Sequence, residues 1–198
     1  MIKKSLLFLF GALLLLIAAV AINTLRKTSH QLQVPALAPL AIDKPAAADR
    51  LAQIVRLSTV SSRDDAQLNA DKFGQLHALL QAKFPLIHAK LKREEVAGLS
   101  LLYTWQGSDP QAQPIMLMAH QDVVPIAPGT EGDWQVPPFA GEVKDGFVWG
   151  RGSWDDKGNL MSQMEAVEML LASGFAPKRT VYLAFGADEE VGGLRGAA

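Results

Sequence analysis

Cysteine is absent from this chain of 198 residues. Disulfide scaffolds, cysteine-ligated zinc fingers, iron–sulfur sites and thiol nucleophiles are therefore excluded. Any metal ion that the chain binds must be held by His, Asp and Glu side chains.

An excess of positive charge and the common nucleotide-binding motifs are also missing. The 19 Lys and Arg residues are balanced by 20 Asp and Glu residues, so we expect no nucleic-acid partner. Gly150-Arg151-Gly152 lacks the third glycine of a dinucleotide loop, and neither a P-loop nor a His-Glu-x-x-His motif occurs. What the chain does have is 49% hydrophobic residues, which predicts a packed core.

One long hydrophobic run stands near the N-terminus. In residues 5–22 only Ser5 and Gly11 are not apolar, and a helix over this run would be about 27 Å long, close to the thickness of a bilayer core. We expect a signal anchor within residues 1–27, with a single pass and the C-terminal part of the chain outside the cytoplasm. A cleaved signal peptide and a secreted product remain the alternative, because Ala19-Val20-Ala21 offers small residues for cleavage.

Residues 28–46 are rich in proline and alanine, which predicts a semi-extended tether. Residues 47–198 then alternate helical and strand-like patterns, as in an α/β layer architecture. The patterns predict helices over 47–57, 66–84 and 160–172, strands over 86–94, 99–105, 114–119 and 179–186, and a hairpin over 141–149 that turns at Asp145-Gly146. The apolar run 114–119 predicts a strand that is buried on both faces.

Polar clusters follow three of these elements. His120 and Asp122 come after the apolar strand, where a carboxylate two residues away can hold the imidazole. Asp155 and Asp156 precede a helix, and Glu189-Glu190 follow the last strand. His with carboxylates is a ligand set for zinc, manganese or cobalt, and in the Glu-Glu pair one side chain can bind metal while the other acts as general base.

Each cluster also has a purely structural interpretation. A single His after a strand is often a hydrogen-bonded structural residue, and Asp155 and Asp156 could complement a helix dipole. Glu189 and Glu190 could be solvated. His30, His77 and His88 lie in ordinary patterns, so we assign them no role.

Three stretches with these residues resemble the M20 family of metallopeptidases and amidohydrolases. They are Met-Ala-His-Gln-Asp-Val-Val-Pro (118–125), Gly-Arg-Gly-Ser-Trp-Asp-Asp-Lys-Gly (150–158) and Ala-Asp-Glu-Glu-Val-Gly-Gly (187–193). Residues 100–110, 133–139 and 165–171 are similar to the branch with carboxypeptidase S (Gly-X carboxypeptidase) and N-fatty-acyl-amino-acid hydrolases. The resemblance runs from about residue 49 to residue 198.

The resemblance implies a three-layer, zinc-exopeptidase-like α/β catalytic domain, incomplete here and preceded by the hydrophobic helix. It implies two zinc ions, with cobalt or manganese as alternatives. His120 would bind one ion, Glu190 the other, and Asp155 would bridge both. Asp122 would orient His120, and Glu189 would be the general base.

We therefore expect a metal-dependent hydrolase that cleaves an amide bond of a peptide or an N-acyl amino acid. An aminoacylase or deacetylase of small N-acylated metabolites is the alternative enzyme, and a non-catalytic, membrane-tethered binding domain is the alternative of another class. The resemblance places further ligands, and a smaller domain with homodimer contacts, after Ala198. We accordingly expect an N-terminal fragment that is inactive by itself.

Overall fold

The computed structural model describes residues 2–36, 38 and 40–196, in two compact units, Met1–Ala41 and Ile42–Ala198. The first unit contains the predicted hydrophobic helix, α1 (Ile2–Leu25). Within Lys3–Leu25 an 18-residue window has a mean hydropathy of 2.9, and none of that window is buried. Among the described residues it is the one helix that is long and apolar enough to cross a membrane, and a signal sequence would have the same properties.

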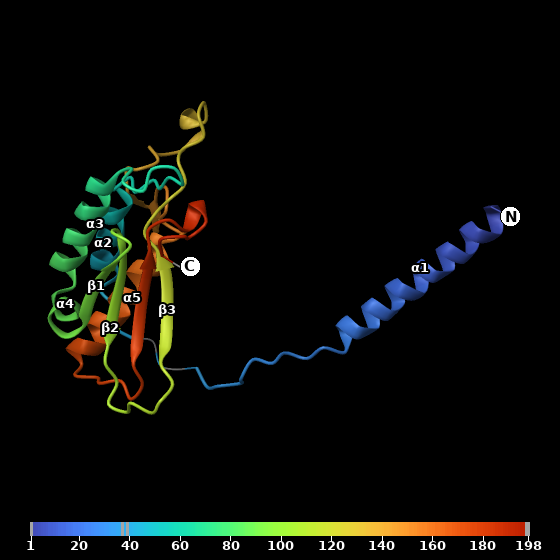
Figure 1. Ribbon diagram of the computed structural model, residues 1–198, viewed down its shortest axis with the longest axis horizontal. Helices are drawn as coiled ribbons and strands as arrows, with labels where there is room; N and C mark the ends of the chain where they lie inside the picture. The colour runs from blue at the N-terminus through green and yellow to red at the C-terminus, as the bar shows by residue number, and fades with distance from the viewer. Residues whose placement is uncertain (1, 37, 39, 197–198) are drawn as a thin grey trace. The chain divides into compact units, whose positions relative to one another are not determined.

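A four-stranded sheet forms the framework of the second unit (Figure 1), in the order β1-β2-β6-β3. β1 and β2 are antiparallel, as are β2 and β6, whereas β6 and β3 are parallel. The strands are β1 (Lys92–Val96), β2 (Ser100–Trp105), β3 (Ile115–His120) and β6 (Val181–Gly186). The mixture of a parallel pair with helices confirms the predicted α/β class.

Four helices share one hydrophobic core with a single face of this sheet. They are α2 (Lys44–Val55), α3 (Ala70–Lys83), α4 (Pro85–Lys90) and α5 (Lys157–Ala172). Tyr103 of β2 and Leu183 of β6 point into this core, where they meet side chains such as Leu160 of α5. Alternate strand residues, including Leu102 and Ala184, lie on the other face and are only partly buried. The described residues therefore form a sheet with one helical layer.

The strand predicted over residues 86–94 is wrong in its first half, which is the helix α4. Pro85 occupies the first helical turn, where its missing N–H costs nothing. The carboxylate of Glu168 on α5 accepts the backbone N–H groups of Leu86 and Ile87, at 2.9 Å each. Glu168 is 82 residues from Leu86 and 81 from Ile87 in the chain, so a local alternation pattern could not reveal this cap.

β3 is a strand as predicted, but its predicted burial on both faces is wrong for the described structure. Met116 and Met118 are 53% and 56% exposed. The physical reason is that Met116 and Met118 share the face of Ala184, which no helix covers among the described residues. Its apolar composition resembles that of a central strand.

The predicted hairpin is present as β4 (Glu142–Lys144) and β5 (Phe147–Trp149). Asp145 and Gly146 have positive φ angles of 54° and 82°, which is the backbone geometry that Asp-Gly favours in a two-residue hairpin turn. Two short 3-10 turns complete the unit, η1 (Glu131–Asp133) and η2 (Glu189–Val191).

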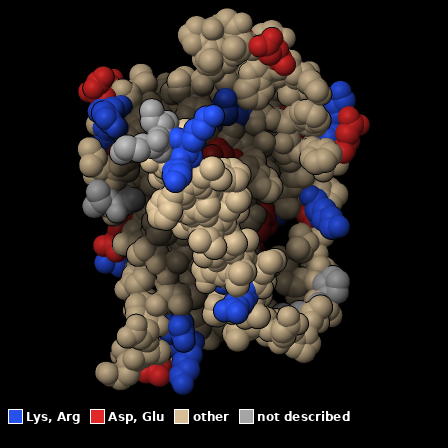
Figure 2. Space-filling model, turned by 90° about the vertical axis from the view of Figure 1, so that its right-hand side faces the viewer, with Lys and Arg blue, Asp and Glu red and all other residues tan. Residues whose placement is uncertain are grey.

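Charged side chains of both signs are visible on the face shown in Figure 2. Several Lys and Arg side chains there have Asp or Glu neighbours, and uncharged surface separates the groups. The surface in that view is therefore of mixed sign.

Candidate metal centre

The parallel pairing of β3 and β6 brings the first and last polar clusters together. His120 ends β3 and lies opposite Gly186, which ends β6. Parallel strands have their carboxyl ends at the same sheet edge, so the residues after Gly186 emerge beside His120. The third cluster arrives from the loop before α5.

Ligand atoms of His120, Asp155 and Glu190 all lie within 4.8 Å of one another. His120 is 8% exposed, whereas Asp155 is exposed and Glu190 is half-buried, so one side of the group is open. One imidazole and two carboxylates suit zinc and related divalent ions. The donor set and its spacing therefore fit a metal ion.

The two ring nitrogens of His120 face different groups. Nδ1 lies 3.0 Å from the backbone oxygen of Asp122 and 3.3 Å from its Oδ1. Because both neighbours are acceptors, we assign a proton to Nδ1. Nε2 lies 3.0 Å from Oδ1 of Asp155 and 3.7 Å from Oε2 of Glu189. Nε2 is thus the nitrogen that can bind a metal.

Electrostatics at His120 favour a proton when no ion is bound. Burial lowers the pKa of His120, but hydrogen bonding and charge from Asp122, together with the contact to Asp155, outweigh it and raise the pKa to about 9. A metal ion must therefore compete with a proton for Nε2.

Asp122 is fully buried and joins both glutamates to the histidine. Its Oδ1 accepts the backbone N–H of Glu189, and its Oδ2 accepts that of Glu190 and the hydroxyl of Ser61. Burial raises the pKa of Asp122, but hydrogen bonds from His120, Ser61 and the Glu190 N–H outweigh it and lower the pKa. The carboxylate thus caps the turn η2 while it holds the imidazole.

Asp155 lies in a loop that two glycines allow to form. Gly152 has a φ of +82°, and a Cβ atom there would be 2.6 Å from Cγ1 of Val123. A Cβ on Gly158 would be 2.4 Å from the backbone oxygen of Ser153. The glycines thus serve close backbone packing before α5, and the peptide bond between Asp155 and Asp156 is cis.

Asp156 and Lys157 support this loop from either side. Oδ2 of Asp156 accepts the backbone N–H of His120, at 3.2 Å. Lys157 is fully buried, and its Nζ donates to the backbone oxygens of Ile54 and Leu57 at the end of α2. Burial lowers the pKa of Lys157 to about 7. The start of α5 is thereby fixed to α2.

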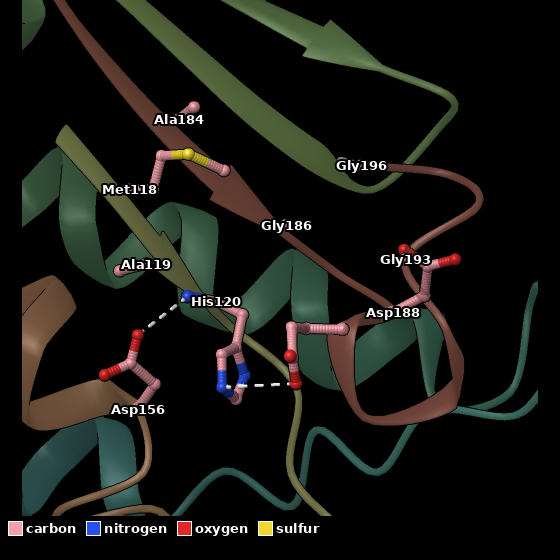
Figure 3. A pocket seen from close by; sticks show the side chains of 10 residues that line it. Met118, Ala119, His120, Asp156, Ala184, Gly186, Asp188, Gly193 and Gly196 are labelled. Carbon is pink, nitrogen blue, oxygen red and sulfur yellow. Dashed lines mark hydrogen bonds and ion pairs between the residues drawn. The ribbon is translucent and has the colours of Figure 1, made fainter. Parts of the chain in front are cut away.

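A cavity of about 180 Å³ adjoins the group (Figure 3), lined by His120, Asp156, Glu189 and the apolar side chains of Met118 and Ala184. The preceding residue, Asp188, also borders it, but its carboxylate turns away from His120. Oδ2 of Asp188 accepts from the backbone and Nε of Arg195 instead. Asp188 therefore stabilises the following turn and is not placed as a ligand.

The structure brings together all five residues that the sequence singles out: His120, Asp122, Asp155, Glu189 and Glu190. The sequence analysis missed Ser61 and Gln121. Gln121 is fully buried, and its amide joins Leu99, Phe185 and His77. Ser61 lies outside the three M20-like stretches, and Gln121 lies inside one of them without a ligand chemistry of its own, so only the fold could reveal their contacts.

Comparison with known proteins shows which family the chain resembles. Residues 116–198 match the model of Peptidase family M20/M25/M40, and this segment contains every candidate ligand. The matched segment therefore resembles proteins of this family. The resemblance, together with the group of His120, Asp155 and Glu190, favours a divalent metal ion.

Curated relatives give a finer resemblance. The chain is 45% identical over 166 residues to carboxypeptidase S of Saccharomyces cerevisiae, covering 83% of this chain and 29% of that protein. It is 41% identical over 197 residues to a probable carboxypeptidase S-like protein 2 of Dictyostelium discoideum, covering 96% and 37%. It is also 41% identical over 157 residues to an N-fatty-acyl-amino acid synthase/hydrolase of Mus musculus, covering 78% and 30%. The chain thus spans about a third of the length of these relatives.

Solved structures confirm the fold. Human carnosine dipeptidase 1 superposes with a TM-score of 0.60 at 19% identity, over 77% of this chain and 34% of that chain. An M20 family metallo-carboxypeptidase of Sulfolobus solfataricus also gives 0.60 at 19% identity, over 78% and 33%. The second unit therefore has the architecture found in M20 peptidases.

Proposed function

We propose that this chain supplies metal ligands and the general base of a hydrolase that cleaves amide bonds. The observation that supports this most strongly is the grouping of His120, Asp155 and Glu190 within 4.8 Å, with the Glu189 carboxylate 3.7 Å from His120. Three ligands beside a free carboxylate suit metal-assisted hydrolysis.

In this proposal His120, Asp155 and Glu190 would hold divalent metal, which we propose to be zinc. The metal supplies Lewis-acid chemistry, which polarises the scissile carbonyl and lowers the pKa of a water molecule. Asp122 keeps the Nδ1 proton on His120, so that Nε2 points at the site. Glu189 accepts the proton of the attacking water and returns it to the leaving amine.

The substrates that we propose are peptides and N-acyl amino acids. Both classes appear in the names of relatives that are about 41–45% identical, the carboxypeptidases and the N-fatty-acyl-amino acid hydrolase. The activity is proposed for a protein of the relatives' length, because this chain spans about a third of them. Hydrolysis of small N-acylated metabolites is the alternative activity.

The substitution Glu189→Gln tests the proposed base, because it removes the basic oxygen and preserves size. We expect a protein of the relatives' length to lose turnover by at least about 100-fold, measured as amine release from an N-acyl amino acid and from a peptide with zinc. Zinc affinity should stay nearly unchanged. Glu142→Gln, on the exposed strand β4, is the matched control and should retain activity.

Retained turnover in the Glu189→Gln protein would remove Glu189 from the mechanism. Zinc binding without turnover in the unsubstituted protein, on any peptide or N-acyl amino acid, would favour the non-catalytic binding domain instead.

We also propose that α1 anchors the protein in a membrane, with the second unit outside the cytoplasm. Its length of 24 residues and its mean hydropathy of 2.9 support this. Cleavage after the hydrophobic run, with release of the second unit, is the alternative.

A further inference from the structure

We propose that Ser61 is a positioning residue of the metal centre, acting through Asp122. This inference depends on the proposed metal site, and it concerns a residue outside all three clusters. Ser61 donates its hydroxyl to Oδ2 of Asp122, with 2.7 Å between the oxygens. Oδ2 is the atom that also accepts the N–H of Glu190.

The segment that contains Ser61 runs beside the chain that leaves β3. Val60 and Val123 form a parallel bridge. Thr59 contributes on both sides of this contact, because its backbone oxygen accepts the N–H of Val123 and its hydroxyl donates to the backbone oxygen of Gln121. These bonds hold residue 61 at the level of residue 122 independently of the serine hydroxyl.

The same segment also contacts the loop of the two glutamates. Arg63 donates to the backbone oxygen of Val191, and Arg195 donates to the backbone oxygen of Ser62. Residues 61–63 therefore contact two parts of the metal centre. Ser61 contacts Asp122, which holds His120, and Arg63 contacts the backbone of η2, which contains Glu190.

Asp122 needs its donors because it is a fully buried carboxylate. Its contacts are the imidazole, two backbone N–H groups and the Ser61 hydroxyl. The two N–H groups come from adjacent residues of one turn, η2, so they hold the carboxylate to a single segment. Ser61 is the donor from a separate segment, and it restricts rotation of the carboxylate about its Cβ–Cγ bond.

Without the hydroxyl, Oδ2 of Asp122 loses one of its two donors, so the carboxylate that contacts His120 and Glu190 is held less firmly. Removal of such an outer partner lowers metal affinity by about 10-fold to 100-fold in metal sites generally. A role in folding alone would instead lower the stability of the metal-free protein and leave the affinity of the folded protein unchanged.

The experiment measures zinc affinity by chelator competition for the full chain in detergent, with the metal alone as probe. The melting temperature of the metal-free protein is measured in parallel. We expect Ser61→Ala to weaken zinc binding at least about tenfold at a temperature where it is folded. Ser61→Thr keeps the hydroxyl and should restore most of the affinity.

Ser62→Ala is the matched control. The Ser62 hydroxyl accepts the backbone N–H groups of Asp64 and Asp65 and does not contact Asp122, so zinc affinity should not change. Equal zinc affinity in Ser61→Ala and the unsubstituted chain would overturn the role of Ser61 and leave the metal site standing. Absence of zinc binding in the unsubstituted chain would overturn the metal site, and the role of Ser61 with it.

Discussion

His120 has a protonation state that links metal binding to pH. Its Nδ1 faces the acceptors of Asp122, and its Nε2 faces Asp155 and Glu189. These acidic neighbours are what raise its pKa to about 9 against the opposing effect of burial. The groups that would help to bind a cation therefore also retain a proton in its absence.

Zinc affinity should therefore rise with pH until about pH 9, because below that value a proton must leave His120 before Nε2 can bind. For one displaced proton, the zinc association constant should rise by at most about tenfold per pH unit. Calorimetry in buffers of different ionisation enthalpy measures both the affinity and the number of protons released. An affinity that does not change between about pH 6.5 and pH 9 would contradict the assigned environment.

The same pKa predicts the stability of the metal-free protein. A base whose pKa rises from 6.5 in the unfolded chain to about 9 in the folded one stabilises the fold fully below pH 6.5. This contribution is lost as pH rises through about 9. In Asp122→Asn the main favourable partner of His120 is neutral. The free energy of unfolding in urea should therefore change less between pH 6.5 and about pH 9 than in the unsubstituted protein.

Among single residues, the sequence predicts candidate metal ligands better than it predicts the residues that hold those ligands in place. The three polar clusters stand out because they lie at strand and loop ends, where ligands converge, and the resemblance to the M20 family assigns the ligand roles to His120, Asp155 and Glu190. The contacts of Ser61, Gln121 and Lys157 were not predicted, because serine, glutamine and lysine have many ordinary positions. Their roles depend on which backbone groups the fold places beside them.

Among the elements, α4 shows how a long-range contact overrides a local pattern. Its six residues are too few for a stable isolated helix. The Glu168 carboxylate accepts two N–H groups at its N-terminus, and Ile87 and Phe84 pack into the core. The strand pattern over these residues was therefore a coincidence of alternating side chains.

Glu168→Ala should reduce the free energy of unfolding by about 1–2 kcal/mol, because two N–H groups at the start of α4 lose their acceptor. Chemical denaturation monitored by circular dichroism measures the change. Glu142→Ala, on the exposed hairpin, should change it by less than about 0.5 kcal/mol. Equal effects of the two substitutions would show that the cap contributes no stability.

β3 differs from α4 in that the local prediction of its structure was right. The apolar run predicts a strand that ends at His120, and the structure pairs His120 with Gly186 of β6. Exposure of Met116 and Met118 depends on which sheet face the helices cover, and a pattern within the strand does not contain that information.

For the whole molecule, the sequence predicts a hydrophobic helix, a tether and an α/β unit, and the structure has the two compact units Met1–Ala41 and Ile42–Ala198. The three M20-like stretches gave the family, because they combine chemistry with fixed spacing. The arrangement of helices over one sheet face followed from tertiary packing, and no single stretch specifies it.

If α1 is an anchor, the protein should stay with membranes after alkaline carbonate washing, and a form without residues 2–27 should be soluble. Mass spectrometry of the membrane fraction should then detect peptides from α1. Detection of the second unit alone, with a new N-terminus just after the hydrophobic run, would show a cleaved signal peptide instead.

The central claim is that His120, Asp155 and Glu190 bind divalent metal ions. Anomalous diffraction from a crystal of the protein soaked in zinc locates bound zinc directly. We predict two zinc peaks, one about 2.0–2.1 Å from Nε2 of His120 and the other about 2.0–2.2 Å from a carboxylate oxygen of Glu190, each also about 2.0–2.2 Å from a carboxylate oxygen of Asp155. A well-occupied zinc peak elsewhere, with none at His120, would contradict the account.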